Sequence, residues 1–175
     1  MCLALLGLID LRYADESAFS LQPNVPYGWI RVGQQRGISS QKGGGLNVLG
    51  LMNLRGDLTS YQTTGNVSSQ TVIGWLDDYA AGVQQTTVVV LDNAPWHRSK
   101  QVEGKIGEWQ HKGMYLFFLP PYCPHLNLIE TLWRKIKHEW LRPQDFESKE
   151  VLHLRINHIL ENYGNRAFSI VFSIK

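Results

Sequence analysis

Three acidic residues stand where a protein built on a β-sheet can place reactive groups. Asp92 directly follows the apolar run at residues 88–91, and Glu130 and Asp15 stand in segments with the patterns of a helix and a strand. Open α/β sheets place their sites at such strand ends. An ionised carboxylate after an apolar strand is costly to bury unless a cation or hydrogen-bond donors compensate its charge. The expected chemistry is therefore that of a cation site.

The donor types indicate which cation and which reaction. Carboxylates without a cluster of Cys or His favour Mg²⁺ or Mn²⁺ over zinc. Two such ions, roughly 3.5–4 Å apart, can activate a water molecule and stabilise the leaving oxygen of a phosphodiester. Phosphoryl transfer is the predicted reaction class.

Two of these acids also have ordinary structural interpretations. Asp92 can cap a turn in which Asn93 and Pro95 are standard turn residues. Glu130 can form a solvent-exposed pair with Arg134, four residues later, which would stabilise a helix by only about 0.2–0.5 kcal/mol. The residue pattern alone leaves these interpretations open.

Asp15 is followed by a second acid, Glu16. Adjacent residues of a strand face opposite sides, so only one of the two can join a given site. Asp15 shares its side with Tyr13 and Phe19, whereas Glu16 shares its side with Ala14. This alternation does not decide between the two acids.

The elements that must position these residues follow from apolar periodicity and turn residues. Strands are expected at residues 11–21, 27–32, 46–54, 86–91 and 114–119, with 57–63 extending the first meander. Helices are expected at residues 68–79 with a Ser cap, 100–111, 127 to about 140, and 149–163. Strands followed by alternating helices and strands predict a mixed sheet with helices packed on its faces.

The helix expected from residue 127 has two distinct faces. A core-facing apolar stripe is formed by Ile129, Trp133, Ile136 and Trp140. Glu130, Arg134 and Lys137 share the neighbouring face, because residues four apart differ by only about 40° around a helix. The carboxylate can thus point toward the sheet while the two basic residues remain free to meet phosphates.

Size and composition restrict the remaining possibilities. The chain has 175 residues, a net charge of +2 and two cysteines without a CxxC spacing, which favours one domain spanning residues 1–175 and a reducing, cytoplasmic setting. Hydrophobic residues make up 43% and charged residues 18%, so disorder, collagen and coiled coils are excluded. The longest apolar run, residues 3–9, is too short to cross a membrane.

Five segments carry a resemblance to a known family. They are ADESAF (residues 14–19), VPYGWIRVGQ (25–34), LNVLG (46–50), VVVLDNAPWHRS (88–99) and LPPYCPHLNLIETLWRKIKHEWL (119–141). In combination they resemble the catalytic domain of mariner-like insertion-sequence transposases, in the DDE superfamily. The resemblance spans most of the chain and implies a ribonuclease H-like α/β fold, a mixed five-stranded sheet with helices on both faces.

The resemblance also implies a set of catalytic residues. Asp15, Asp92 and Glu130 match the three acids with which the family binds two Mg²⁺ or Mn²⁺ ions, hydrolyses DNA at the element ends, and joins the freed 3′-hydroxyl to target DNA. Asn93 and His97 resemble the residues beside the second aspartate. Asn127 resembles the asparagine before the third acid, and all three are expected to support the metal ligands.

Double-stranded DNA, as transposon ends and target, is the partner that the resemblance implies. The basic residues that we expect to track its backbone are Arg98, Lys100, Arg134 and Lys137. A homodimer in the DNA complex and a nucleoid-associated location are also expected. The helix-turn-helix region that such transposases carry before the first catalytic strand has no counterpart in this sequence, so a separately encoded half, a split reading frame or a remnant is expected.

Two other functions are compatible with the same residues. A non-catalytic remnant would bind DNA or a partner transposase through this surface without cutting. A stand-alone ribonuclease H-like nuclease would cut RNA hybrids or junctions without joining strands.

Overall fold

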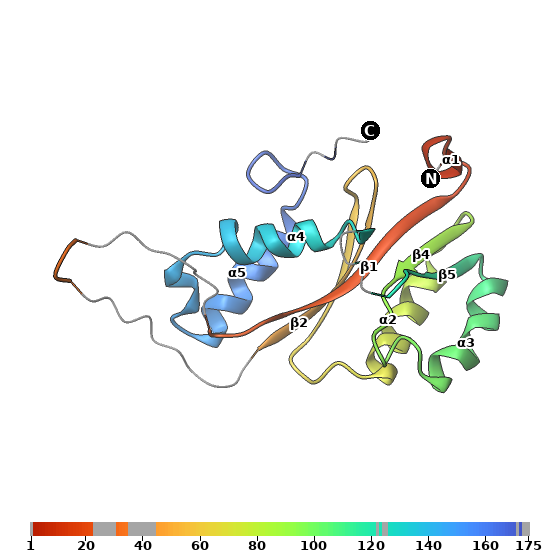
Figure 1. The fold of residues 1–175 in the computed structure, drawn as a ribbon, viewed down its shortest axis with the longest axis horizontal. Helices are drawn as coiled ribbons and strands as arrows, with labels where there is room; N and C mark the ends of the chain where they lie inside the picture. Colours follow the sequence, from red (N-terminus) through yellow and green to blue (C-terminus); the bar gives the residue numbers. More distant parts are fainter. Residues whose placement is uncertain are drawn as a thin grey trace.

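The computed structural model describes residues 2–22, 31–34, 45–121, 123, 126–170 and 172. Its centre is a five-stranded sheet in the order β3-β2-β1-β4-β5 (Figure 1). The strands are β1 (Asp10–Phe19), β2 (Leu46–Asn53), β3 (Leu58–Thr63), β4 (Thr87–Leu91) and β5 (Met114–Phe118). β1, β2 and β3 form an antiparallel meander, whereas β4 and β5 run parallel to β1. This confirms the predicted mixed five-stranded sheet.

Helices cover both faces of this sheet, as the fold prediction requires. α2 (Ser69–Ala81) and α3 (Lys100–His111) pack on one face. α4 (Glu130–Lys135), its continuation as a π-helix η2 (Ile136–Trp140), and α5 (Lys149–Glu161) pack on the other. A short α1 (Cys2–Leu5) precedes β1, and a 3-10 helix η3 (Pro143–Phe146) precedes α5.

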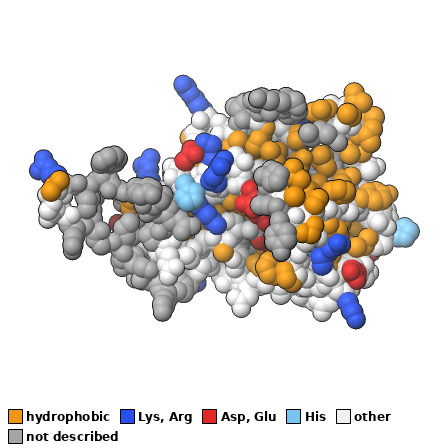
Figure 2. All heavy atoms as spheres, in the orientation of Figure 1, with side chains coloured by type: hydrophobic (Ala, Val, Ile, Leu, Met, Phe, Trp, Pro, Cys, Tyr) orange, Lys and Arg blue, Asp and Glu red, His pale blue; other side chains and the backbone are white. Residues whose placement is uncertain are grey.

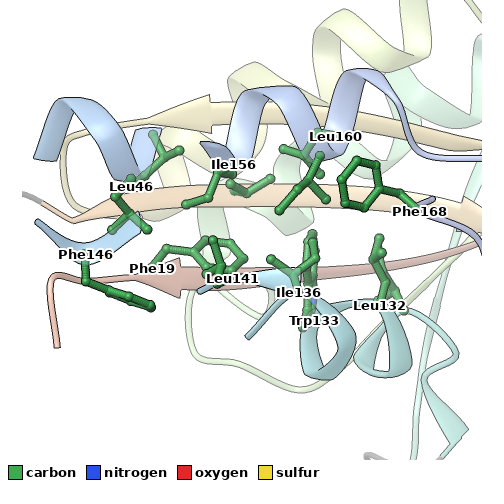
Figure 3. Close-up of a cluster of buried hydrophobic side chains, with 14 of the residues drawn as sticks. Phe19, Leu46, Leu132, Trp133, Ile136, Leu141, Phe146, Ile156, Leu160 and Phe168 are labelled. Carbon is green, nitrogen blue, oxygen red and sulfur yellow. The ribbon is translucent and has the colours of Figure 1, made fainter. Parts of the chain in front are cut away.

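Each face of the sheet has its own core, because alternate residues of each strand point to opposite sides. Phe19 of β1 lies in the cluster beneath α4 and α5, together with Trp133 and Ile156 (Figure 3). Ala14 of the same strand lies in the cluster beneath α2 and α3, with Trp109. Strand β1 is therefore covered on both faces and links the two layers of helices.

Serine caps begin three of the helices. The side chain of Ser68 accepts a hydrogen bond from the Thr71 amide at the start of α2, as the sequence predicted. Ser99 and Ser148 cap α3 and α5 in the same way. A serine at this position satisfies an amide that the helix leaves unpaired, so it fixes where the helix begins. The start of α3 bears on the site, since it follows the loop after Asp92.

Two expected elements differ from the observed ones. Of the strand expected at residues 27–32, residues 27–30 lie outside the described part, and Arg31 and Val32 lie in a turn. The long helix begins at Glu130 rather than at residue 127, because Asn127 and the two residues after it form a turn in which the Glu130 amide donates to the Asn127 carbonyl (3.1 Å). The predicted apolar stripe of this helix is confirmed: Ile129, Trp133 and Ile136 are buried and Trp140 packs against them.

Candidate active site

Strand register brings two of the three acids together. β1 and β4 run parallel with Tyr13 opposite Val90, and Asp15 and Asp92 each stand two residues further along. They therefore lie side by side where β4 ends, on the same side of the sheet as Tyr13 and Val90. Tyr13 packs against the core beneath α4, so both aspartates face the layer that contains Glu130.

A glycine lets the helix that carries the third acid approach closely. Gly50 of β2 is paired with Asp15. A Cβ atom at Gly50 would lie 2.6 Å from Cδ1 of Ile129 and 2.9 Å from the ring of Trp133. The absence of a side chain allows these two residues to pack directly on the strand, which places Glu130, the first residue of α4, next to Asp15.

Asn127 fixes the loop before α4 to the sheet. Its Nδ2 donates to the carbonyl of Ala14 (3.0 Å), so the orientation of the amide is determined, because a carbonyl can only accept. Oδ1 of Asn127 is then buried without a hydrogen-bond donor among the described residues. Such an oxygen is costly to leave unpaired, so it is available to a water molecule, a hydroxyl or a cation.

A cavity of about 410 Å³ joins the residues of this region. Its polar lining comes from Asp92, Asn93, Asn127 and Glu130. Asn93 is held in place by donating a side-chain hydrogen bond to the Leu119 carbonyl at the end of β5. Figure 2 shows acidic side chains near the middle of this face of the molecule, with Lys and Arg side chains beside them.

The charges of this region act most strongly on Asp15. Burial, together with the negative charges of Glu130, Glu16 and Asp92, raises the pKa of Asp15 to about 8. No ion pair with a described residue offsets this repulsion. A carboxyl group with so high a pKa marks a position where negative charge has collected, which is common at functional sites.

Asp92 has the opposite environment because His97 supports it. Nδ1 of His97 lies 2.7 Å from Oδ1 of Asp92, and the Ala94 amide donates to the same oxygen (2.9 Å). These hydrogen bonds, that of His97 first, lower the pKa of Asp92 although burial opposes the shift. Burial alone would lower the pKa of His97, but its hydrogen bonds to Asp92 and Glu16 raise it to about 9. His97 is therefore an imidazolium at neutral pH.

Glu16 is a component of the site that sequence reasoning missed. Its Oε1 lies 2.8 Å from Nε2 of His97, and its side chain is only 9% exposed. Alternation along β1 placed Glu16 on the side opposite Asp15, which is correct, and the family resemblance then selected Asp15 alone. The available signal was the pair of adjacent acids itself. Two consecutive acids of a strand point to opposite faces of the sheet, and both can contribute to a site at the end of a neighbouring strand.

The four expected DNA contacts differ in their surroundings. Lys137 is half-buried, with Nζ 5.5 Å from the centroid of Phe19. Burial lowers its pKa, while the charges of Asp15 and Glu130 oppose that shift, so Lys137 lies in the field of the acids. Arg134 is exposed on α4, Lys100 is exposed at the start of α3, and Arg98 lies over Phe118 with Cζ 4.2 Å from the ring centroid.

The donor set fits a divalent cation. In their ionised forms Asp15, Glu16, Asp92 and Glu130 carry four negative charges, whereas the described cations in contact with them or in their field are His97 and Lys137. Two negative charges remain, and carboxylate and amide oxygens are ligands that Mg²⁺ and Mn²⁺ prefer. Within the described ranges no three His, Cys, Asp or Glu side chains are already close enough to hold an ion.

The sequence profile of the DDE superfamily endonuclease family matches residues 10–153. The chain belongs to this family. The match includes all three acids, the cavity and Glu16, so the resemblance on which the triad was predicted is confirmed at the level of the family. A transposase or endonuclease domain of the DDE type is therefore established, whereas the roles of individual residues are not assigned by the match.

The similarities to individual proteins agree with this family. In 60 residues the chain is 33% identical to an uncharacterized protein of Sinorhizobium fredii, y4pE/y4sA, over 34% of this chain and 40% of that protein. Its fold is similar to that of the Mos1 transposase in a paired-end complex with the left transposon end, with 14% identity, a TM-score of 0.59 and coverage of 91% of this chain and 52% of that chain.

A Mos1 paired-end complex with Mg gives the same fold, with 15% identity, a TM-score of 0.61 and coverage of 85% of this chain and 47% of that chain. The DDE domain thus has a ribonuclease H-like fold of the mariner type, and the chain spans about half the length of the solved chains that it matches.

A second cavity, of about 670 Å³, lies away from this site, at the start of β1. Its lining includes Asp10, Arg12, Tyr61 and Tyr79 but none of the three acids.

No helix in the part of the chain that the structure describes is both long and apolar enough to cross a membrane.

Proposed function

We propose that this DDE domain is a divalent-metal-dependent DNA endonuclease and strand transferase, with Asp15, Asp92 and Glu130 as the ligands of two Mg²⁺ or Mn²⁺ ions. One observation carries the proposal. The parallel register of β1 and β4, and the close approach of α4 over Gly50, bring three acids from distant parts of the chain to one side of the sheet. Burial of Asp15, together with the negative charges of Glu130, Glu16 and Asp92, raises its pKa to about 8.

The residues at the site would have different roles in binding a phosphodiester. Asp92 and Glu130 line the cavity, so a phosphodiester entering it meets their carboxylates first. Lys137, in the field of Asp15 and Glu130, is positioned to contact a phosphate oxygen, and Arg134 on the exposed side of α4 would extend that contact along the backbone. Bound divalent ions would supply an activated water and stabilise the leaving oxygen.

The proposed partner is double-stranded DNA, cut at the ends of a mobile element and joined to a target. The support is that the Mos1 structures of the same fold are transposon-end complexes. Arg98 and Lys100 follow the loop after Asp92 and would contact DNA on that side of the cavity. We further propose that residues 1–175 act as one catalytic domain in the cytoplasm at the nucleoid, as a homodimer on DNA that works together with a helix-turn-helix module.

A nicking assay tests the proposal. Supercoiled plasmid and oligonucleotide duplexes carrying candidate ends would be incubated with the protein in Mg²⁺, in Mn²⁺ and in EDTA. We expect metal-dependent nicking that Asp92→Asn and Glu130→Gln abolish, whereas Glu161→Gln, an exposed acid at the end of α5, leaves it unchanged. Equal nicking by the parent and Asp92→Asn would show that the assignment is wrong.

The same assay separates the other two functions. A non-catalytic remnant would bind the duplex and never nick it with either metal, even when it is supplied with a helix-turn-helix module. A stand-alone nuclease would cut an RNA–DNA hybrid without joining the 3′-hydroxyl to a second duplex.

A further inference from the structure

Strand β1 sends its two adjacent acids to opposite faces of the sheet, and both converge on the end of β4. Asp15 faces α4 and Glu130. Glu16 faces the other way, where it meets His97 from the loop after β4 at 2.8 Å. His97 is fully buried and its other ring nitrogen is 2.7 Å from Asp92. The imidazole thus lies between a carboxylate from each of two neighbouring strands.

From this geometry we infer that Glu16 is a positioning residue. Through His97 it fixes the orientation of the Asp92 carboxylate, so that one oxygen is bound by His97 and the other is free to face the cavity. We call this arrangement of Glu16, His97 and Asp92 the clamp. The inference rests on the proposed function, because it concerns the carboxylate that we expect to bind metal. It assigns to Glu16 and His97 a shared role, which acts through Asp92 and not on the substrate.

The hydrogen bonds define which oxygen of Asp92 is free. Oδ1 accepts from both His97 and the Ala94 amide. The described residues provide no donor to Oδ2, and the Asp92 side chain is 49% exposed on the cavity side. The carboxylate is therefore held by one oxygen in a fixed rotamer and presents the other. A ligand oriented in advance binds a cation more tightly, because less side-chain freedom is lost on binding.

Glu16 is what makes this arrangement of His97 stable. Both partners of the ring are carboxylates, which can only accept, so both ring nitrogens must donate. Without Glu16, a fully buried Nε2–H would lose its acceptor, and the imidazolium would keep one counter-charge instead of two. The ring would then be free to rotate or to lose a proton, and Asp92 would lose its fixed partner.

The backbone around His97 supports the same conclusion. The amides of His97 and Arg98 both donate to the Ala94 carbonyl (2.9 and 3.2 Å), which closes a tight turn directly after Asp92. Because of this turn, the imidazole of His97 lies next to the strand ends and contacts Glu16, whose side chain is only 9% exposed. A buried glutamate at this position requires a cationic partner, and His97 is the one that the fold provides.

The experiment measures Mn²⁺ affinity, by calorimetry or by the EPR signal of free Mn²⁺, together with steady-state nicking in Mg²⁺. The variants are Glu16→Ala, Glu16→Gln, His97→Asn and Asp92→Asn, with Glu161→Gln as the matched charge control and circular dichroism to verify folding. Removing the outer partner of a metal ligand typically costs about 10–100-fold in affinity or activity.

We expect Glu16→Ala and His97→Asn to weaken Mn²⁺ binding and lower kcat by about 10–100-fold, with the KM for DNA unchanged. Glu16→Gln keeps an acceptor oxygen and should recover part of the loss, also where Glu16→Ala fails to fold. The clamp is refuted if Glu16→Gln and His97→Asn bind Mn²⁺ within twofold of the parent while Asp92→Asn does not bind. Parental Mn²⁺ affinity in Asp92→Asn would refute the proposed function itself.

Discussion

Strand β1 carries one aspartate at its start and another in its middle, and the two are compensated in different ways. Asp10 accepts a hydrogen bond from Nε of Arg12 at 2.6 Å, and Arg12 also donates to the carbonyl of Asp57. Asp15, five residues further on, has other acids as its neighbours. One carboxylate is thus neutralised by an ion pair within the chain, whereas the other forms no ion pair with a described residue.

The difference indicates what each aspartate is for. An ion pair such as Asp10–Arg12 is satisfied within the chain and adds at most about 1 kcal/mol of stability. Acids that collect without enough counter-charge destabilise the folded chain unless a cation joins them, so they persist where a function requires them. The same strand therefore carries one structural carboxylate, Asp10, and one that is suited to bind a ligand, Asp15.

The largest effect should come from removing a carboxylate at the site, in comparison with removing Asp10. Asp15→Asn and Asp92→Asn should each reduce Mg²⁺-dependent nicking by more than about a hundredfold. Mutation of a residue that only hydrogen-bonds to a metal ligand already lowers activity by up to about that factor. Asp10→Asn should leave nicking unchanged because neither Asp10 nor Arg12 lines the cavity. Initial rates on supercoiled plasmid measure all three variants, and an equal loss in Asp10→Asn and Asp15→Asn would contradict the comparison.

The close approach of α4 to the sheet can be broken at Gly50. A valine there would place atoms within 3 Å of Ile129 and Trp133, and overpacking of this kind costs up to about 3 kcal/mol. We expect urea unfolding of Gly50→Val to show that loss together with reduced nicking. A matched Gly74→Val change, on the exposed side of α2 with open space around its Cβ, should leave stability unchanged or slightly higher, since glycine is the poorer helix former. Parental stability in Gly50→Val would show that α4 is not held against the strand here.

The raised pKa of Asp15 predicts that the stability of the protein depends on pH. Because the pKa of Asp15 is raised to about 8 in the folded chain from 3.8 when unfolded, the folded state binds the extra proton between those values. Stability of the metal-free protein should therefore fall as pH rises through this window. Asp15→Asn should remove that fall and raise stability at pH 9 by several kcal/mol, since one pKa unit corresponds to about 1.4 kcal/mol. Thermal melts in EDTA from pH 5 to 9 would contradict this if the parent and variant curves ran parallel.

The smallest effect is expected at the structural end of β1. Asp10→Asn removes the charged partner of Arg12 and should cost about 1 kcal/mol, the upper value for an exposed pair. Both side chains are about 15% exposed (15% and 16%), so the loss should persist in moderate salt. Denaturant titration at two salt concentrations measures it, and addition of Mn²⁺ should not restore the lost stability.

Most of the fold could be predicted from the sequence because its signals are local. The run at residues 86–91 predicted β4 almost to its ends, and helix α3 matched the expected range 100–111. Where local signals failed, a long-range contact decided. Asn127 fits a helical stretch, but its side chain is bound to β1, so the helix starts three residues later.

The site could be predicted in part for the same reason. The position of Asp92 after an apolar strand indicated reactive chemistry, and family resemblance selected Asp15 and Glu130, which the structure brings near it. The contact between Glu16 and His97 joins residues 81 positions apart, and no periodicity in either segment reports it. The guanidinium of Arg98, an expected DNA contact, lies over Phe118, and charge patterns do not report stacking on a nearby ring.

The central claim is that the charge left at Asp15, Asp92 and Glu130 is matched by a divalent cation. The most direct test is the thermal midpoint of the parent and of the triple variant Asp15→Asn, Asp92→Asn, Glu130→Gln as Mn²⁺ is added at pH 7.5. At a hundred times the dissociation constant, binding stabilises a protein by about 2.7 kcal/mol, or roughly 5–10 °C at this size. We predict that shift in the parent and none in the triple variant. Equal shifts in both proteins, or no shift in the parent, would contradict the account.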